Sequence, residues 1–434
     1  RARSAAIGHA GEKVYAILDG GERGEIWQMP ADGSGAGKAL TSGSKVYVWA
    51  IWPSPHDETL LYSDKRGRLF HLDPDTGRST LIDETAGSSD FAFGDFNWSS
   101  DGRYIAYSFY DGRDIAQVAV YDTKDKKKHV LTSGKYESFA PVFARDGKWL
   151  YFISNRQFDA TPSSPWGDRN MGPAFQARGK IYALQLDPEA SFPFQPDDEL
   201  DAKRKAEEKK EKDEKKDSEK KKSDDEDEES KTVTIDFDGV SSRLWEVPLG
   251  SGAFAQLAAS EGHLFVLEGG GSDLVYSGRQ DTVLKRAEIK DEGAKLETYA
   301  SDVRRFALSA DASKLFVQTG DGRNANYVIA DAKKDFPSNP SEEAVRLGDW
   351  SLRIDPDAEW QQMAEDAWRL HRDFAFDPNL RGVDWQAVGD HYLPMAERLG
   401  HRTELNDLLA QMSSELGILH SQIRQGEVPR DGES

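Results

Sequence analysis

One pattern recurs between residues 5 and 335 and constrains the fold more than any other feature of the chain. It joins an apolar or aromatic residue, a short polar turn around an aspartate, and an alternating apolar strand. The clearest copies are Trp52–Ser63, Trp98–Ser108, Phe143–Ser154 and Leu308–Val317. The turn residues Asp57, Asp101 and Asp146 are 44 and 45 positions apart, so the repeating unit has about 45 residues.

This period predicts a β-propeller over residues 1–345. Asp-Gly pairs such as Asp101-Gly102 supply the positive-φ position of a hairpin turn, and the alternating runs supply strands with one buried face. A unit of about 45 residues with four short strands is the size of one propeller blade. We count about six units, which predicts six or seven blades. Stacked β-sandwiches are the rival fold, but they seldom show such a period.

The repeat residues themselves predict structure and not chemistry, because a fold does not imply a function. We interpret the recurrent aspartates as turn residues and the recurrent aromatic residues as packing between blades. One blade is interrupted by a charged insertion at about 195–231. Its residues 197–230 hold 17 acidic and 11 basic side chains and almost no apolar ones, which predicts a disordered loop.

After about residue 350 the period changes to that of amphipathic helices. Apolar side chains at spacings of three and four predict a first helix that starts at Asp357 and ends before Pro378. Asp384 and Thr403 are expected to cap two more helices, and Gly417 to end the last one. Residues 418–424 then favour a strand. Residues 351–434 are therefore predicted to be a small α-helical subdomain that ends in a strand of an incomplete α/β core.

Composition excludes several functional classes. The net charge of −21 disfavours nucleic acid and anionic membranes as partners. No run of about 18 apolar residues exists, which predicts no transmembrane helix. The chain has 0 cysteines, so thiolate chemistry and thiolate metal sites are excluded. We expect no metal and no cofactor, since phosphate-loop, dinucleotide and zinc-protease motifs are missing.

The nine histidines are scattered through the chain. His56, His71, His129 and His263 lie in blade turns and strands, and we expect each to be packed or at the surface. His371 lies on the apolar side of the first helix and has the same interpretation. His420 differs, because it follows a helix–Gly junction at the edge of an incomplete domain. Such a position suits a general base that meets a nucleophile from another segment.

The helical segment resembles the first part of the catalytic core of tricorn-type proteases, a family of S41-type serine peptidases. The residues that carry the resemblance are Glu359-Trp360, Trp368, Asp377-Pro378-Asn379, Trp385, Glu415-Leu416-Gly417 and Leu419-His420-Ser421. The preceding repeats are similar to the family's second propeller, with Arg169-Asn170, Ile181-Tyr182, the charged insertion and Ile235–Val240. The resemblance covers nearly the whole chain.

The resemblance implies an activity, an assembly and a site. Members are self-compartmentalising serine peptidases that degrade oligopeptides, assemble as homo-hexamers, and use propellers to gate and channel substrate. His420 matches the general base, whereas the nucleophilic Ser and a Glu belong to later parts of the family pattern. Because residue 1 is Arg and the end is polar, we expect a fragment of a longer protein, inactive alone. The implied compartment is the cytoplasm, with periplasmic or exported relatives as the alternative.

One departure from the family pattern concerns the residues next to the candidate base. The family has a Ser before this His, and here that position is Leu419, whereas the hydroxyl follows at Ser421. Adjacent side chains on a strand point to opposite faces, so Ser421 does not simply replace the missing hydroxyl. A second hypothesis from another class remains open, in which the chain is a non-catalytic propeller that binds proteins or peptides.

Overall fold

A computed structural model provides the structure of the chain, and it divides into two compact units, Arg1–Val345 and Arg346–Ser434. The described residues are 2–18, 24–86, 92–156, 177–195, 232–269, 282–290, 293–320, 325–347, 353–419, 421–424 and 426.

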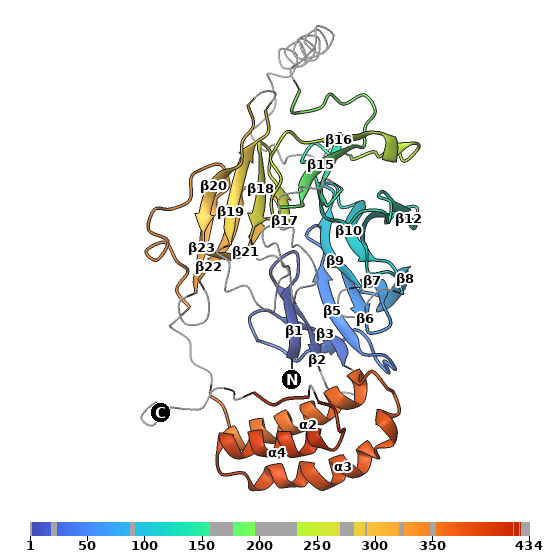
Figure 1. The fold of residues 1–434 in the computed structure, drawn as a ribbon, viewed down its shortest axis with the longest axis vertical. Coiled ribbons are helices and arrows are strands. Elements are labelled where there is room, and N and C mark those ends of the chain that lie inside the picture. Colours follow the sequence, from blue (N-terminus) through green and yellow to red (C-terminus); the bar gives the residue numbers. More distant parts are fainter. Residues whose placement is uncertain are drawn as a thin grey trace. The chain divides into compact units, whose positions relative to one another are not determined.

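The first unit is a β-propeller of six antiparallel sheets, counted over the described residues (Figure 1). Blades 1 and 2 consist of β1 (Ala2–Ile7), β2 (Lys13–Leu18), β3 (Glu25–Pro30), β4 (Lys38–Ala39), β5 (Val48–Pro53), β6 (Leu60–Asp64), β7 (Arg68–Asp73) and β8 (Arg78–Glu84). Blades 3 and 4 consist of β9 (Phe93–Trp98), β10 (Tyr104–Tyr110), β11 (Ala116–Asp122), β12 (Lys127–Val130), β13 (Ser138–Phe143), β14 (Trp149–Ser154), β15 (Lys180–Gln185) and β16 (Leu244–Glu246). Blades 5 and 6 consist of β17 (Phe254–Ala259), β18 (His263–Glu268), β19 (Val283–Glu288), β20 (Glu297–Ser301), β21 (Val303–Leu308), β22 (Lys314–Thr319) and β23 (Asn326–Asp331).

Within each blade the strands pair in sequence order, and the first strands of blades 1 and 2, 3 and 4, and 4 and 5 lie next to one another. Blade 6 has three strands, and a bridge between Val328 and Ala344 stands where a fourth strand would pair. The prediction of a mainly β propeller followed by helices is confirmed. Of the two blade numbers that the sequence left open, the described residues give six.

Aromatic residues of the repeat pack between neighbouring blades, as their pattern predicts. Trp149 on β14 is fully buried and shares a core with Leu257 and Val266 of blade 5. Phe143 on β13 belongs to the core that joins blade 4 to Val118 and Val120 of blade 3. Burying large side chains on both faces of a sheet is what a blade achieves only among neighbours.

The recurrent aspartates have the expected role in turns. Gly102 and Gly147, which follow two of them, both adopt a φ of +71°. The Asp146 carboxylate accepts a hydrogen bond from the Lys148 amide at 2.9 Å. In the last copy, hydrogen bonds from the Ser309 hydroxyl and from Ser313 lower the pKa of Asp311 to about 2. These carboxylates are occupied by their own turns.

The turn glycines supply a matched pair of variants. A Cβ on Gly147 would lie 2.7 Å from a methyl group of Val233, at a positive φ. Gly262 occupies the corresponding turn of blade 5, with no atom within 4 Å of a Cβ and no positive φ. We therefore expect G147A to lower the free energy of unfolding by about 1–3 kcal/mol. G262A should leave it unchanged or slightly higher in denaturant titration, and equal losses in both variants would contradict this account.

The charged insertion predicted at about 195–231 lies, apart from residue 195, outside the described residues. Its sequence position is between β15 and β16, so it interrupts blade 4. The chain that follows it is anchored at Val233, whose amide donates to the Asp101 carboxylate at 2.8 Å. Val233 and Ile235 are buried against blades 3 and 4.

The second unit contains three α-helices and two 3-10 segments within residues 353–419. They are α2 (Pro356–Phe374), η5 (Leu380–Gly382), α3 (Trp385–Tyr392), η6 (Leu393–Arg398) and α4 (Arg402–Ser414). Buried side chains from all five pack into one core. Figure 1 shows α2, α3 and α4 in orange and red.

Two of the three predicted helix starts are wrong by one or two residues. The cap of α2 is Asp355 and not Asp357, because Pro356 occupies the first helical position, where its missing N–H costs nothing. The cap of α4 is His401 and not Thr403, and the Glu404 side chain returns to the His401 amide in a capping box. Asp384 caps α3 as predicted and accepts from the Ala387 amide at 3.0 Å.

The predicted strand over 418–424 is absent from the described residues of that segment. The Ser421 amide donates to the Ile418 carbonyl at 3.2 Å, a contact across three residues. Three residues of extended strand span about 10 Å, so this bond requires a turn in place of a strand. Gly417, expected to end the helix, has a φ of +60°.

Candidate functional site

His420, the predicted general base, lies outside the described residues, but the segment on either side of it is described. Arg381 donates to the Gly417 carbonyl at 3.3 Å and so ties the end of α4 to η5. Ile418 and Ile423 pack against the core of the helical unit from both sides of position 420. Described residues on both sides of position 420 therefore contact the helical core.

The two neighbours of His420 have opposite environments. The Leu419 side chain is 87% exposed, although leucine is usually buried. The Ser421 side chain is half-buried, and its Oγ lies 3.5 Å from Nε2 of His371. The hydroxyl that the sequence places after His420 thus contacts the helical unit, and the position before His420 offers no hydroxyl.

The His371 ring is fixed from two directions. Its Nδ1 lies 2.8 Å from the carbonyl oxygen of Ala367, one turn earlier on α2. A carbonyl can only accept, so Nδ1 is the donor in this contact, and Nε2 is the ring nitrogen that lies near Ser421. The ring also packs against Trp385, with centroids 5.6 Å apart.

Trp385 is itself held by a reciprocal pair of hydrogen bonds to α2. The Trp368 indole donates to the Trp385 carbonyl at 2.7 Å, and the Trp385 indole donates to the Trp368 carbonyl at 2.9 Å. Gly389 on α3 makes room, because a Cβ there would lie 2.5 Å from the Trp368 indole nitrogen. This tryptophan pair joins α2 to the start of α3, and the ring of His371 packs against Trp385 of the pair.

Sequence reasoning missed the contact between His371 and Ser421. The two residues are 50 positions apart, so no local period connects them. The placement of His371 on the apolar side of its helix was the one available signal, and its packing on Trp385 confirms that placement.

The other four histidines named from the sequence are half-buried in the propeller. Burial is the main cause that lowers the pKa of His56, His71, His129 and His263. His129 stacks on Phe237 with ring centroids 3.6 Å apart. Packing, as predicted, accounts for these residues.

Turns from several blades meet at one end of the propeller. Arg145, in the first turn of blade 4, donates to the Ala310 carbonyl in the corresponding turn of blade 6 at 3.1 Å. Burial is the main cause that lowers the pKa of His56, in the first turn of blade 2, while nearby Arg145 lowers it and Asp57 raises it. Basic and acidic side chains from the turns of several blades therefore lie near one another at this end.

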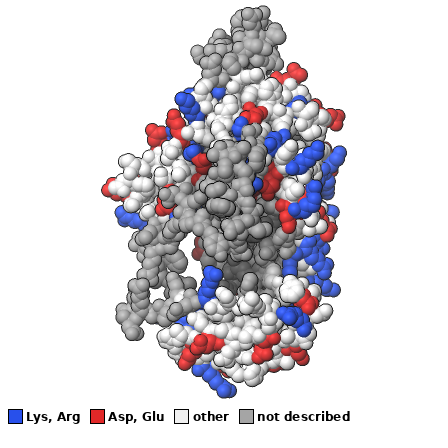
Figure 2. Space-filling model, viewed as in Figure 1, with Lys and Arg blue, Asp and Glu red and all other residues white. Residues whose placement is uncertain are grey.

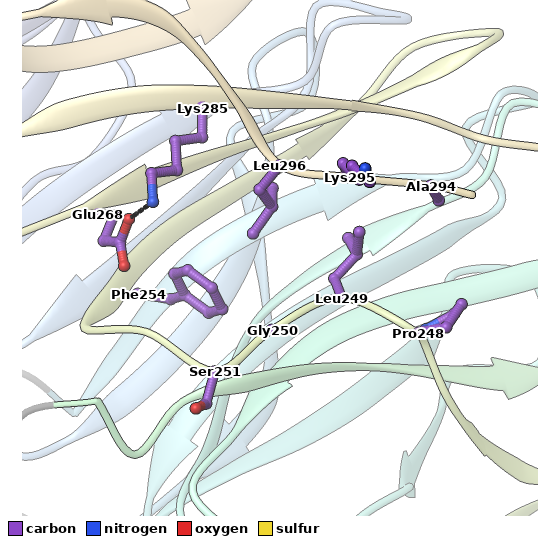
Figure 3. A pocket seen from close by; sticks show the side chains of 10 residues that line it. All are labelled: Pro248, Leu249, Gly250, Ser251, Phe254, Glu268, Lys285, Ala294, Lys295 and Leu296. Carbon is purple, nitrogen blue, oxygen red and sulfur yellow. Dashed lines mark ion pairs between the residues drawn. The ribbon is translucent and has the colours of Figure 1, made fainter.

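A cavity of about 340 Å³ lies beside blade 5 (Figure 3). Leu249, Phe254 and Leu296 form its apolar wall. Glu268 and Lys285 form an ion pair across β18 and β19 at its edge.

Among the described residues, no group of three or more His, Asp or Glu side chains is arranged to hold a metal ion. None of the described helices is long and apolar enough to cross a membrane. Figure 2 shows acidic and basic side chains interspersed over the described surface in that view.

The propeller and the helical unit after it define a class of multidomain propeller proteins. Two family models match the chain in this order. The tricorn protease second beta propeller domain matches residues 1–328, and the tricorn protease C1 domain matches residues 356–414. The chain belongs to the tricorn protease family.

Individual relatives agree with this assignment. Tricorn protease homolog 1 of Streptomyces coelicolor is 24% identical over 95% of this chain and 38% of its own length. The tricorn protease of Thermoplasma acidophilum is 22% identical over 86% of this chain and 32% of its own length. A crystal structure of the tricorn protease has the same fold, with a TM-score of 0.75 and 19% identity over 97% of this chain and 38% of that one. The chain thus spans about a third of the length of these relatives.

Proposed function

We propose that the chain is the propeller and histidine-bearing portion of an S41-type serine peptidase that degrades oligopeptides. His420 is the general base for a serine nucleophile that lies outside these 434 residues. It removes the proton of the serine hydroxyl during attack and returns a proton to the leaving amine. A Glu, also outside this chain, completes the site.

One observation carries this proposal. Two consecutive family domains match in the family's order, and the second match ends at residue 414, just before His420. The segment after it is docked on the helices at Ile418 and Ile423, on both sides of the candidate base. A general base must be held within reach of its nucleophile for proton transfer to occur.

The propeller guides peptides toward this site in the proposed function. The complete protein assembles as a homo-hexamer in the cytoplasm, as the family resemblance implies.

The isolated chain of 434 residues is expected to hydrolyse no oligopeptide. The complete gene product should hydrolyse them and should lose that activity when a serine-directed fluorophosphonate is added. The reason is that a base without its nucleophile gives no covalent catalysis. A peptide-release assay on both proteins, at equal concentration, checks this expectation.

The alternative, a non-catalytic peptide-binding propeller, gives the opposite results. The complete gene product would then bind peptides without cleaving them, and fluorophosphonate would have no effect. Hydrolysis by the isolated chain would contradict both hypotheses.

A further inference from the structure

The contact between His371 and Ser421 has no place in the proposed chemistry, yet it adjoins the proposed base. His371 lies near the end of α2, and Ser421 immediately follows His420. Three features of the pair point to a specific role. They are the hydrogen bond from Nδ1 of His371 to Ala367, the packing of its ring on Trp385, and the hydrogen bond from the Ser421 amide to the Ile418 carbonyl.

The Ala367 carbonyl accepts from Nδ1–H of His371 at 2.8 Å. In this Nδ1–H tautomer, Nε2 is the ring nitrogen that can accept, and the Ser421 hydroxyl, 3.5 Å from it, is the donor of the pair. This contact with a partly buried ring holds Ser421 close to α2.

The ring cannot readily turn away from Ser421. It packs on Trp385, which is 4% exposed and locked to Trp368 by two hydrogen bonds. The His371 side chain is thus partly buried and supported by the core of the helical unit.

Ser421 transmits this rigidity to the backbone of the segment. Its amide closes the turn to the Ile418 carbonyl at 3.2 Å, while its hydroxyl contacts His371. With Arg381 bound to the Gly417 carbonyl, the segment is held at residues 417, 418 and 421. These contacts bracket position 420.

We propose that His371 is a positioning residue of the peptidase, which holds Ser421, the residue that follows the proposed base His420. This inference rests on the proposed function of His420. It also gives Ser421 a role different from the hydroxyl that precedes the base in the family pattern. Ser421 anchors the segment to the helices, and it neither attacks the substrate nor bridges to a carboxylate.

The test uses the complete gene product and two pairs of variants. S421A removes the hydroxyl and S421T keeps it. H371F keeps a ring against Trp385 but has no nitrogen, whereas H371Q keeps a polar group that can accept from Ser421. H391F, on the exposed His391 of α3, is the matched control.

We expect S421A and H371F each to lower kcat roughly 10- to 100-fold with KM unchanged, because misplacement of a base by about 1 Å has effects of this size. S421T and H371Q should restore most of kcat, and H391F should equal the wild type. The double variant S421A/H371F should be no slower than either single variant, since both remove the same contact. Helix content and melting temperature of S421A should match the wild type.

Contrary results are separable. Full kcat in S421A, or losses that multiply in the double variant, would overturn the positioning role. Complete loss of turnover in S421A without rescue by S421T would also overturn it and would assign Ser421 to the chemistry. If H420A retains full turnover, or the wild type has none, the proposed function itself fails and the positioning role falls with it. Should H371F not fold, S421A and S421T decide the question, because Ser421 lies outside the helices.

Discussion

H420A in the complete gene product is expected to lower kcat/KM for oligopeptides by about four orders of magnitude or more. A serine hydroxyl is a weak nucleophile until a base within hydrogen-bond reach removes its proton, and losing that base leaves only binding and oxyanion stabilisation. The measurement is steady-state hydrolysis of a fluorogenic oligopeptide, with substrate binding checked separately. Circular dichroism and the assembly state should be those of the wild type.

The matched control for this variant is H391A, which removes an exposed histidine from the same helical unit. It should retain wild-type kcat/KM. Normal hydrolysis by H420A would refute the assignment of His420 and favour the binding-module hypothesis. Equal losses in H420A and H391A would point to damage of the helical unit in place of lost chemistry.

The propeller could be predicted from the sequence because its information is local and repeated. Asp101-Gly102 and Asp146-Gly147 mark turns whose glycines do adopt positive φ. A repeat of six similar units tolerates one weak copy, so the architecture survives errors in single blades.

In the helical unit, local sequence patterns do not predict every conformation. A short apolar run such as residues 418–424 fits a strand by its alternation, but tertiary contacts decide its conformation. Here the hydrogen bond from Ser421 to Ile418 and the docking of Ile423 produce a turn. The helix starts were displaced for a related reason, since the side chain that reaches the free amides is known only from the packed structure.

The candidate site likewise contains one residue that the sequence indicated and others that only the structure revealed. The family resemblance and the position after a helix–Gly junction made His420 the candidate base from the sequence. Its supports, His371 and the Trp368–Trp385 pair, come from residues 17 to 50 positions apart. No period or motif connects such residues, so a three-dimensional structure was needed to find them. At the departure from the family pattern, Leu419 is exposed and the Ser421 hydroxyl contacts His371.

W385A is expected to lower the free energy of unfolding of the helical unit by about 3–5 kcal/mol. It removes a side chain that is 4% exposed, leaves a cavity beside Trp368 and His371, and deletes the hydrogen bond to the Trp368 carbonyl. A unit of this size has a total stability of about 5–15 kcal/mol, so the change takes a large share of it. Denaturant titration followed by the helical signal of circular dichroism measures the shift.

The matched control is F376A, which removes an aromatic side chain that is 81% exposed in the same unit. It creates no cavity and should change stability by less than about 0.5 kcal/mol. In the complete gene product W385A should also reduce kcat, because the ring of His371 loses the surface against which it packs. Equal stability losses in W385A and F376A would show that the tryptophan pair is not what holds α2 to α3. A stability loss in W385A with unchanged kcat would instead show that the segment around position 420 does not depend on Trp385 for its placement. That placement would then be assigned to Arg381, Ile418 and Ile423.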